Sequence, residues 1–268
     1  MGKMNKISAA CVLAGTALLV SGLPYKMDIK EYGVQSAKVR KPFRTVILAD
    51  LHCIAFGKGQ RKLLEQIEKL QPDLILIPGD LFDVDRNFEN SFDLVRGLQK
   101  YPVFFTSGNH DNYLDEMDQL RERLRDLGVI VLENETITLQ VNNQLIEIAG
   151  LSDHGRRPLY TPEQTDALFH HPDSFQILMS HRPEFMDFYR QLHADMIVCG
   201  HAHGGQFRIP FTKQGLYAPQ QGFFPKYTEG VIDDRIVISR GLASGNPWLP
   251  RLFNNPEITV VDAAGEEQ

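Results

Sequence analysis

The sequence predicts an α/β protein, and two features of the chain carry this prediction. Short β-branched or aliphatic runs alternate with segments in which apolar residues recur at helical spacing, and this strand–helix–strand order repeats between residues 45 and 106. The chain has 268 residues, 43% of them hydrophobic, and contains no low-complexity tract. That length and composition suffice for one large domain with a full hydrophobic core.

The first 24 residues predict a targeting segment that is separate from the fold. Lys3 and Lys6 precede an uncharged run from Ile7 to Leu23. Its length lies between that of a signal-peptide core and the ~20 apolar residues of a full membrane span. Residues 1–24 are therefore either a cleaved signal peptide or an uncleaved signal anchor, and a buried N-terminal helix is the remaining alternative. Residues 25–42 are expected to be a linker, followed by the main domain at 43–268.

The lysines before the uncharged run favour a cytoplasmic N-terminus and export of the downstream domain. We therefore expect the domain to lie at the extracytoplasmic face of the cell membrane, held by the N-terminal anchor, or to be secreted after signal cleavage.

Three expected strands in the first half of the chain each end in polar residues that can bind metal ions. The strands cover residues 45–49, 74–78 and 102–106, and the helices after them cover about 60–70, 90–98 and 115–127. The polar residues after the strands are Asp50 and His52, then Asp80 and Asp83, then Asn109 and His110. Because the carboxyl ends of parallel strands meet at one sheet edge, we expect these side chains to cluster.

After Gly128 the alternation gives way to neighbouring strands, which predicts a second sheet. Strands are expected at 129–132, 136–141 and 145–149, with Asn142 and Asn143 in a tight turn between the last two. Strands at 175–179 and 196–199 lead to His181 and to the pair His201 and His203, and a helix is expected at 184–192. Further strands are expected around residue 231, at 236–239 and at 258–261.

Together, the strand-end residues form a ligand set of carboxylates, an amide and imidazoles without thiolate. Such ligands suit a pair of divalent ions such as Mn, Fe or Zn. One carboxylate would have to bridge two ions held ~3.5–4 Å apart, and an ion pair of that kind is a clamp for displacement at phosphorus. Cys53 comes directly after a ligand, but the set is complete without it, so we treat it as a non-ligand.

The charge and cysteine content of the chain exclude some classes of binding partner and site. The net charge of −6 argues against a basic face for duplex nucleic acid. An anionic ligand would need a local positive centre such as a metal ion. Cys11, Cys53 and Cys199 are scattered without CxxC spacing, which predicts neither a disulfide framework nor a structural zinc site. Nothing in the sequence indicates the oligomeric state.

Five blocks of the sequence resemble, in order and spacing, those of the calcineurin-like metallophosphoesterases. The blocks are Asp50-Leu51-His52, Gly79-Asp80-Leu81-Phe82-Asp83, Gly108-Asn109-His110-Asp111, His181, and Gly200-His201-Ala202-His203. Downstream, Gly204-Gly205-Gln206 and the segments 215–219 and 222–227 are similar to the bacterial exported or membrane-anchored branch that includes the YkuE-type phosphoesterases.

The resemblance implies a four-layer α/β/β/α sandwich of two mixed sheets flanked by helices. It also implies a metal-dependent phosphoric ester hydrolase acting on a phosphodiester, pyrophosphate or phosphomonoester, most readily a diester, through attack by a hydroxide that bridges two metals. The implied ligands are Asp50, His52 and His203 for one ion and Asn109, His181 and His201 for the other, with Asp80 bridging. His110 would protonate the leaving oxygen, and Asp83 would orient His110. The alternative is a noncatalytic binding or scaffold member of the same fold.

Residues 207–227 carry six aromatic side chains among three basic ones. They could bind an amphiphilic phosphoester, contact a membrane surface, or pack as a loop over the sheet edge. A lipid-linked or nucleotide-sugar phosphoester is the favoured substrate. Arg182 would contact a substrate phosphate or form a surface ion pair, Asp153 would lie near the site or in an ordinary turn, and Trp248 would line the cleft or pack.

Overall fold

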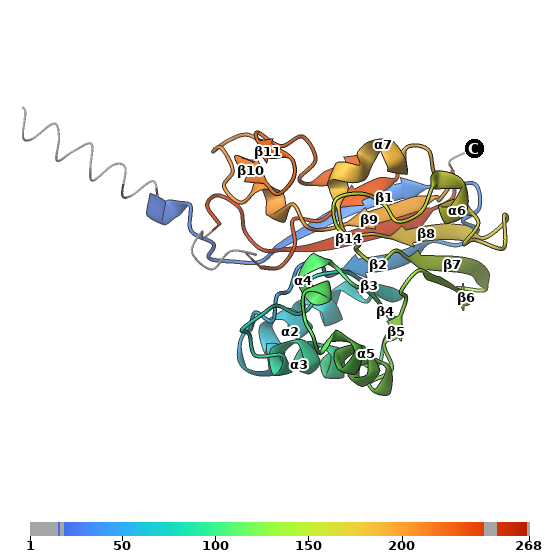
Figure 1. Ribbon diagram of the computed structural model, residues 1–268, viewed down its shortest axis with the longest axis horizontal. Helices are drawn as coiled ribbons and strands as arrows, with labels where there is room; N and C mark the ends of the chain where they lie inside the picture. Colours follow the sequence, from blue (N-terminus) through green and yellow to red (C-terminus); the bar gives the residue numbers. More distant parts are fainter. Residues whose placement is uncertain (1–15, 17–18, 244–250, 267–268) are drawn as a thin grey trace, which may run out of the picture.

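A computed structural model describes residues 16, 19–243 and 251–266. It contains two six-stranded mixed sheets that pack face to face, with helices on the outer face of each sheet (Figure 1). The prediction of a four-layer α/β/β/α sandwich is therefore confirmed.

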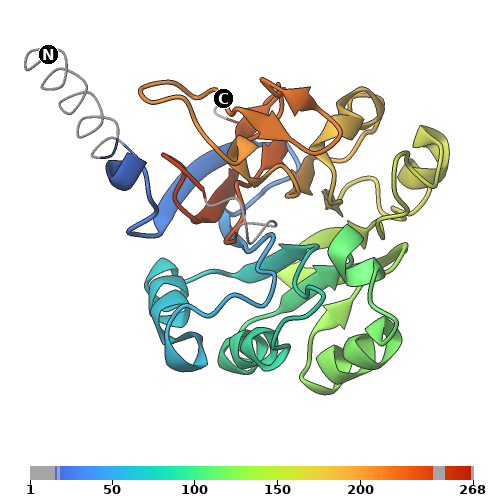
Figure 2. The same cartoon turned by 60° about the vertical axis from the view of Figure 1, so that its left-hand side comes forward.

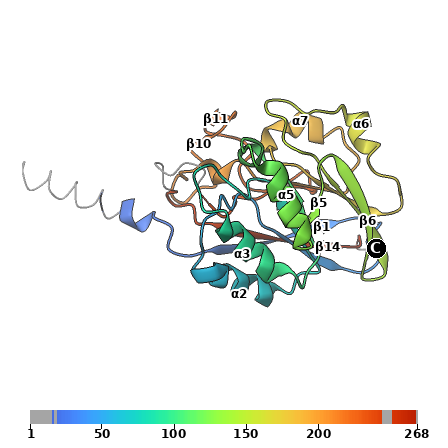
Figure 3. The ribbon, with the colours of Figure 1, turned by 60° about the horizontal axis from the view of Figure 1, so that its bottom comes forward.

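The first sheet carries the strand–helix alternation that the sequence predicts. Its order is β1-β14-β2-β3-β4-β5, and β2 to β5 run parallel. The strands are β1 (Asp28–Gln35), β14 (Glu257–Ala264), β2 (Phe43–Ile47), β3 (Leu74–Pro78), β4 (Val103–Thr106) and β5 (Ile130–Val131). The helices that cover its outer face are α2 (Arg61–Leu70), α3 (Glu89–Leu98) and α5 (Met117–Asp126) (Figure 3). Because β3 and β4 are buried on both faces, they read as unbroken apolar runs.

The second sheet has the order β12-β13-β9-β8-β7-β6. Its strands are β12 (Gly230–Ile232), β13 (Ile236–Ile238), β9 (Met196–Cys199), β8 (Phe175–Met179), β7 (Gln144–Gly150) and β6 (Glu135–Val141). The short helices α6 (Pro162–Asp166) and α7 (Met186–Tyr189) lie on its outer face. The remaining elements are η1 (Lys58–Gln60), α4 (Asn109–Asn112), η2 (Pro183–Phe185), η3 (His203–Gly205) and the small hairpin β10 (Tyr217–Ala218) and β11 (Gly222–Phe223).

The two sheets share a continuous apolar core. Its fully buried members include Ile47, Leu76 and Phe104 from the first sheet and Ile148, Ile177 and Val198 from the second. Burying a side chain of this size stabilises the fold by about 1.5–3 kcal/mol. The core therefore fixes how the strand ends of one sheet face those of the other.

Three details of the fold differ from the prediction. Residues 25–42 are not a linker throughout, because Asp28–Gln35 form β1, which pairs with β14 along its whole length. This edge strand buries little more than Tyr32 and Val34, so its sequence lacks the apolar pattern that predicts a strand. The strand predicted at 129–132 pairs with β4 in the first sheet rather than joining the second. The helix predicted at 184–192 is instead two short pieces, η2 and α7, the first beginning at Pro183.

Most of the predicted targeting segment, residues 1–15 and 17–18, lies outside the described residues, as does Trp248. Among the residues that are described, no helix has the length and apolar character needed to cross a bilayer.

Candidate metal centre

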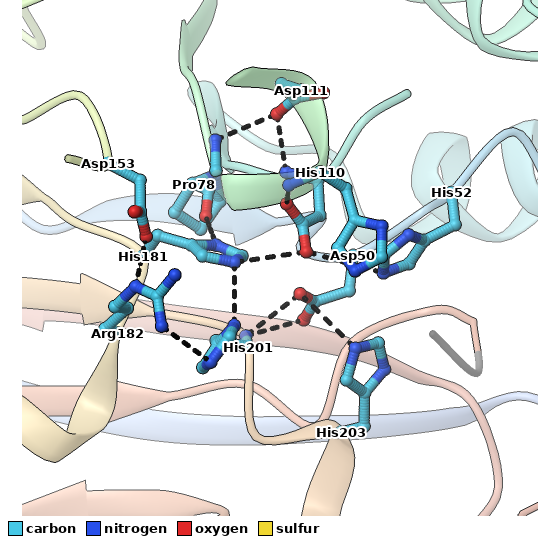
Figure 4. A network of polar contacts seen from close by, with 12 residues as sticks. Asp50, His52, Pro78, His110, Asp111, Asp153, His181, Arg182, His201 and His203 are labelled. Carbon is cyan, nitrogen blue, oxygen red and sulfur yellow. Dashed lines mark hydrogen bonds and ion pairs between the residues drawn. The ribbon is translucent and has the colours of Figure 1, made fainter. Parts of the chain in front are cut away.

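The nine residues predicted for the site lie together where strand ends of both sheets meet. Figure 4 shows Asp50, His52, His110, His181, His201 and His203 among them. Sheet one supplies five of them after β2, β3 and β4, and the short helix α4 begins with Asn109 and His110. Sheet two supplies three others, His181 after β8 and His201 and His203 after β9, and Asp83 lies on the loop beyond β3. All are buried except His110, whose side chain is 29% exposed.

One group of possible ligand atoms comes from Asp50, His52, Asp80 and His203, and these atoms all lie within 4.8 Å of one another. His203 Nδ1 donates to the carbonyl of Ala243 at 2.6 Å. That bond directs Nε2 toward Asp50, with Oδ1 at 4.0 Å. Fixing one imidazole nitrogen on a carbonyl is how proteins orient a histidine that binds a metal through the other nitrogen.

A second group comes from Asp80, His181 and His201. His181 Nδ1 donates to the carbonyl of Pro78 at 2.9 Å, and its Nε2 lies 3.1 Å from Asp80 Oδ2. His201 Nδ1 lies 3.2 Å from His181 Nε2, while His201 Nε2 donates to Gln220 Oε1 at 2.8 Å. The free nitrogens of both histidines thus converge on the same point as the Asp80 carboxylate.

Asp80 belongs to both groups. Its Oδ1 accepts the backbone N–H of His110 at 2.9 Å. Its Oδ2 lies 3.6 Å from His52 Nε2 and 3.1 Å from His181 Nε2. This carboxylate has the placement of a ligand that bridges two ions.

Several buried polar atoms at the centre have no hydrogen-bond partner: Asp80 Oδ2, both ring nitrogens of His52, and Asn109 Oδ1. Buried polar atoms normally find partners, so a cluster of orphans around one point is the pattern that bound cations would satisfy. Asn109 and Asp80 also line the same pocket. The donor set is oxygen and imidazole, and it fits two divalent ions.

The backbone is strained at the residues that present the ligands. Five of the strand-end residues have left-handed backbones, with φ of 53° at Asp50, 47° at His52, 54° at Asp80, 64° at His201 and 47° at His203. Such a conformation costs a non-glycine residue on the order of 1–3 kcal/mol and is concentrated at functional sites. The turns aim successive side chains into the centre.

The electrostatics favour positive charge at the second group. Burial alone would lower the pKa of His181, but the close negative charges of Asp80 and Asp50 raise it to about 10. Burial lowers the pKa of His201 to about 3, and the neighbouring charges of His181 and Arg182 add to this effect. The carboxylates therefore stabilise a cation here, and a divalent ion would supply that charge.

His110 lies at the edge of the centre, between Asp83 and the pocket. Its Nδ1 and Asp83 Oδ1 are 2.8 Å apart, and Asp83 Oδ2 is 3.2 Å from His52 Nδ1. Burial opposes protonation of His110, but the hydrogen bond to Asp83 and the charges of Asp80 and Asp83 outweigh it, so the pKa of His110 is raised. His110 can therefore carry and donate a proton, with Asp83 fixing its ring.

A pocket of about 330 Å³ opens onto the centre. Asp80, Asn109, His110 and His201 form its floor, and Tyr113 and Tyr217 belong to its lining. Both tyrosines are exposed, Tyr113 at 66% and Tyr217 at 43%, so we place them at the mouth of the pocket.

Three residues that hold the centre have no role predicted from the sequence. Asp111 accepts backbone N–H groups of Asp80, Phe82 and Gly108. Gln220 binds His201 from a loop with no periodic pattern. Arg251 is buried and donates to the carbonyl of Ala243, the same oxygen that orients His203. Only Asp111 has a sequence signal, as the last residue of the Gly108–Asp111 block.

The structure resolves two alternatives that the sequence leaves open. Arg182 is buried rather than on the surface; it pairs with Asp153 at 2.5 Å, and its Nη1 lies 3.3 Å from His201 Nε2. Asp153 therefore lies beside the centre, and its Oδ1 also accepts the backbone N–H of Gly155 in a turn (Figure 4). Cys53 contacts Leu81 and Ser91 and belongs to neither ligand group described above.

The family model described as calcineurin-like phosphoesterase matches residues 43–205. Phosphodiesterase YaeI of Escherichia coli (strain K12) is 29% identical over 82% of this chain and 82% of its own. The metallophosphoesterase YkuE of Bacillus subtilis (strain 168) is 27% identical over 88% of this chain and 85% of its own. Among solved structures, the match to an archaeal phosphodiesterase covers 77% of this chain and 89% of the archaeal chain, with 15% sequence identity and a TM-score of 0.40.

Proposed function

The chain belongs to the calcineurin-like phosphoesterase family, and we propose that it is a dimetal phosphodiesterase. The observation that carries this proposal is the Asp80 carboxylate, whose unpartnered Oδ2 is shared by two groups of ligands. A single carboxylate placed in this way serves two ions at once, which is the arrangement suited to displacement at phosphorus.

The two groups support a set of metal ligands. Asp50, His52 and His203 would hold one ion, His181 and His201 would hold the other, and Asp80 would bridge them. Asn109, whose buried Oδ1 has no partner, would complete the second set. Mn, Fe and Zn all suit these donors. When bound, two such ions neutralise phosphate charge and lower the pKa of a water molecule so that it can attack phosphorus.

His110 supplies the proton for the leaving oxygen. Its Nδ1 is held by Asp83, so its Nε2 is available to the pocket. Asp83 stabilises the protonated ring, because the hydrogen bond from His110 and the nearby charges of His52 and His110 outweigh burial and lower the pKa of Asp83. A positioned acid of this kind contributes about 10²–10⁴-fold to the rate.

A diester is the preferred substrate, over a pyrophosphate or a phosphomonoester. The similarity to a protein named a phosphodiesterase supports this choice. So does the pocket, whose mouth is flanked by exposed tyrosines that could contact a second substituent on phosphorus. We further propose that residues 1–24 place the domain at the extracytoplasmic face of the cell membrane, where a lipid-linked or nucleotide-sugar phosphoester is the substrate class.

The test is hydrolysis of bis(p-nitrophenyl) phosphate by protein reconstituted with Mn, Fe or Zn, alongside Asp80→Ala, His110→Ala and the control His193→Ala. His193 is an exposed histidine that pairs with Asp166. We expect Asp80→Ala to lose bound metal and activity. His110→Ala should keep its metal and lose about 10²–10⁴-fold in rate. His193→Ala should match the parent.

Two outcomes contradict the proposal. A fully metal-loaded parent that hydrolyses no phosphoester would favour the noncatalytic alternative. A higher kcat/KM for p-nitrophenyl phosphate than for the diester would reverse the substrate preference.

A further inference from the structure

Five exposed apolar side chains lie on one segment of the chain, and one of them, Tyr217, lines the pocket. They belong to the segment 207–227, and they are Ile209, Phe211, Tyr217, Phe223 and Phe224. We call these five residues the aromatic face. Phe211 is fully exposed, and Phe223 and Phe224 are 72% and 62% exposed. Exposed apolar side chains gathered in this way mark a surface that contacts another apolar phase or partner.

The backbone holds the aromatic face in place. Tyr217 and Phe223 pair across the β10–β11 hairpin, with their ring centroids 5.6 Å apart. Arg208 pairs with Gly215, and Thr212 closes a tight turn by donating its backbone N–H to the carbonyl of Ile209 at 3.1 Å. The side chains are therefore exposed on an ordered support.

The charge of this segment is opposite to that of the chain. Residues 207–227 contain three basic residues and no aspartate or glutamate, whereas the whole chain has a net charge of −6. Arg208 is buried against Glu229, which leaves Lys213 and Lys226 exposed beside the aromatic face. Apolar rings with lysines around them match a surface that is anionic outside and apolar beneath.

The aromatic face also adjoins the end of the uncharged N-terminal run. Phe207 pairs with Leu252, and the next residue, Phe253, donates its N–H to the carbonyl of Gly22 at 2.6 Å. Leu19, Val20 and Leu23 are exposed there. In Figures 1 and 2 the β10–β11 region and the blue N-terminal residues lie at the same end of the molecule.

We propose that the aromatic face docks on a lipid bilayer with anionic headgroups. This inference depends on the proposed function in one respect, namely that the domain is located at a membrane. Gln220 lies between the two strands of the hairpin and contacts the ligand His201, and Tyr217 lines the pocket. Docking would therefore bring the pocket mouth to the headgroup region, where a phosphoester of a lipid can enter it.

The experiment measures contact between the aromatic face and the bilayer separately from any membrane anchoring by residues 1–24. The full chain carries Cys11→Ser and Phe224→Cys, with a thiol-linked NBD fluorophore on the new cysteine; Cys53 and Cys199 are buried. The vesicles are phosphatidylcholine with phosphatidylglycerol, with and without doxyl-labelled lipid as a quencher. The matched control is Leu145→Cys, an exposed apolar position on β7 in the second sheet.

We expect a blue shift and doxyl quenching at residue 224 and neither at residue 145. Lys213→Glu combined with Lys226→Glu should reduce the quenching at 224 on anionic vesicles. Two results would overturn the proposal: vesicle-bound protein without quenching at residue 224, or equal quenching at residues 224 and 145. The first is the result expected if the aromatic face binds another protein instead of a bilayer. Diester hydrolysis is assayed in the same samples, so a failure of docking and a failure of catalysis are told apart.

Discussion

Asp80 and Asp111 act together at the centre of the site. The carboxylate of Asp80 faces both ligand groups, while its backbone N–H donates to Asp111 Oδ2 at 2.7 Å. Asp111 also accepts the N–H of Gly108 at 2.9 Å, so one side chain ties the turn after β3 to the turn after β4. Asp111 is therefore a positioning residue, since it holds the backbone that presents the bridging ligand.

Gln220 is the residue for which the structure makes the sharpest prediction. Its Oε1 accepts the Nε2 proton of His201, which leaves Nδ1 for a metal. Loss of such a partner typically weakens metal binding 10–100-fold. We expect Gln220→Ala to weaken binding at the His181–His201 position by about this factor and to leave the other position unchanged, as measured by competition with a fluorescent chelator.

Gln140→Ala, an exposed glutamine on the edge strand β6, is the matched control. Affinities equal to those of the parent at both positions would show that Gln220 does not orient His201.

At the scale of the elements, the turns at the strand ends determine whether the ligands converge. Gly79, between β3 and Asp80, has φ 93°, and a Cβ there would lie 2.5 Å from His181 Nδ1 and 2.7 Å from the Cα of Gly108. Gly79→Ala should therefore lower the free energy of unfolding by about 1–3 kcal/mol or more through backbone strain alone and weaken metal binding. Urea unfolding and metal content measure the two effects.

The control for this prediction is Gly33→Ala in β1. A Cβ there meets nothing within 4 Å. The change in stability should stay within about 0.5 kcal/mol. A similar loss of stability at both glycines would mean that the close contacts of a Cβ at position 79 with His181 and Gly108 do not cause the destabilisation.

The same elements show how much the sequence alone can predict. The strand predicted at 74–78 has its observed bounds, because a strand buried on both faces is a continuous apolar run. The site residues are predictable because they come directly after such strands. β1 escapes prediction because an edge strand needs few apolar residues, and Gln220 escapes it because its role depends on a contact between a loop and a distant strand end.

At the scale of the whole molecule, the metal centre links the two sheets. Asp50, His52 and Asn109 come from the first sheet, whereas His181, His201 and His203 come from the second. The folded chain brings these ligands together and the unfolded chain disperses them. Bound ions therefore stabilise the native state in proportion to RT ln(1 + [M]/Kd), where [M] is the free metal concentration.

Removing the metal should lower the melting temperature. At a free metal concentration of 100 Kd, each site contributes about 2.7 kcal/mol, and 1 kcal/mol corresponds to roughly 2–4 °C in a protein of this size. With both sites filled at that concentration, we expect EDTA to lower the melting temperature by roughly 10–20 °C, and added Mn to restore it, in differential scanning calorimetry. Asp80→Ala should show a much smaller response to both, because both groups lose their shared ligand. An equal response in parent and variant would mean that the ions bind elsewhere, because a centre built around Asp80 cannot keep its affinity for both ions once their shared carboxylate is gone.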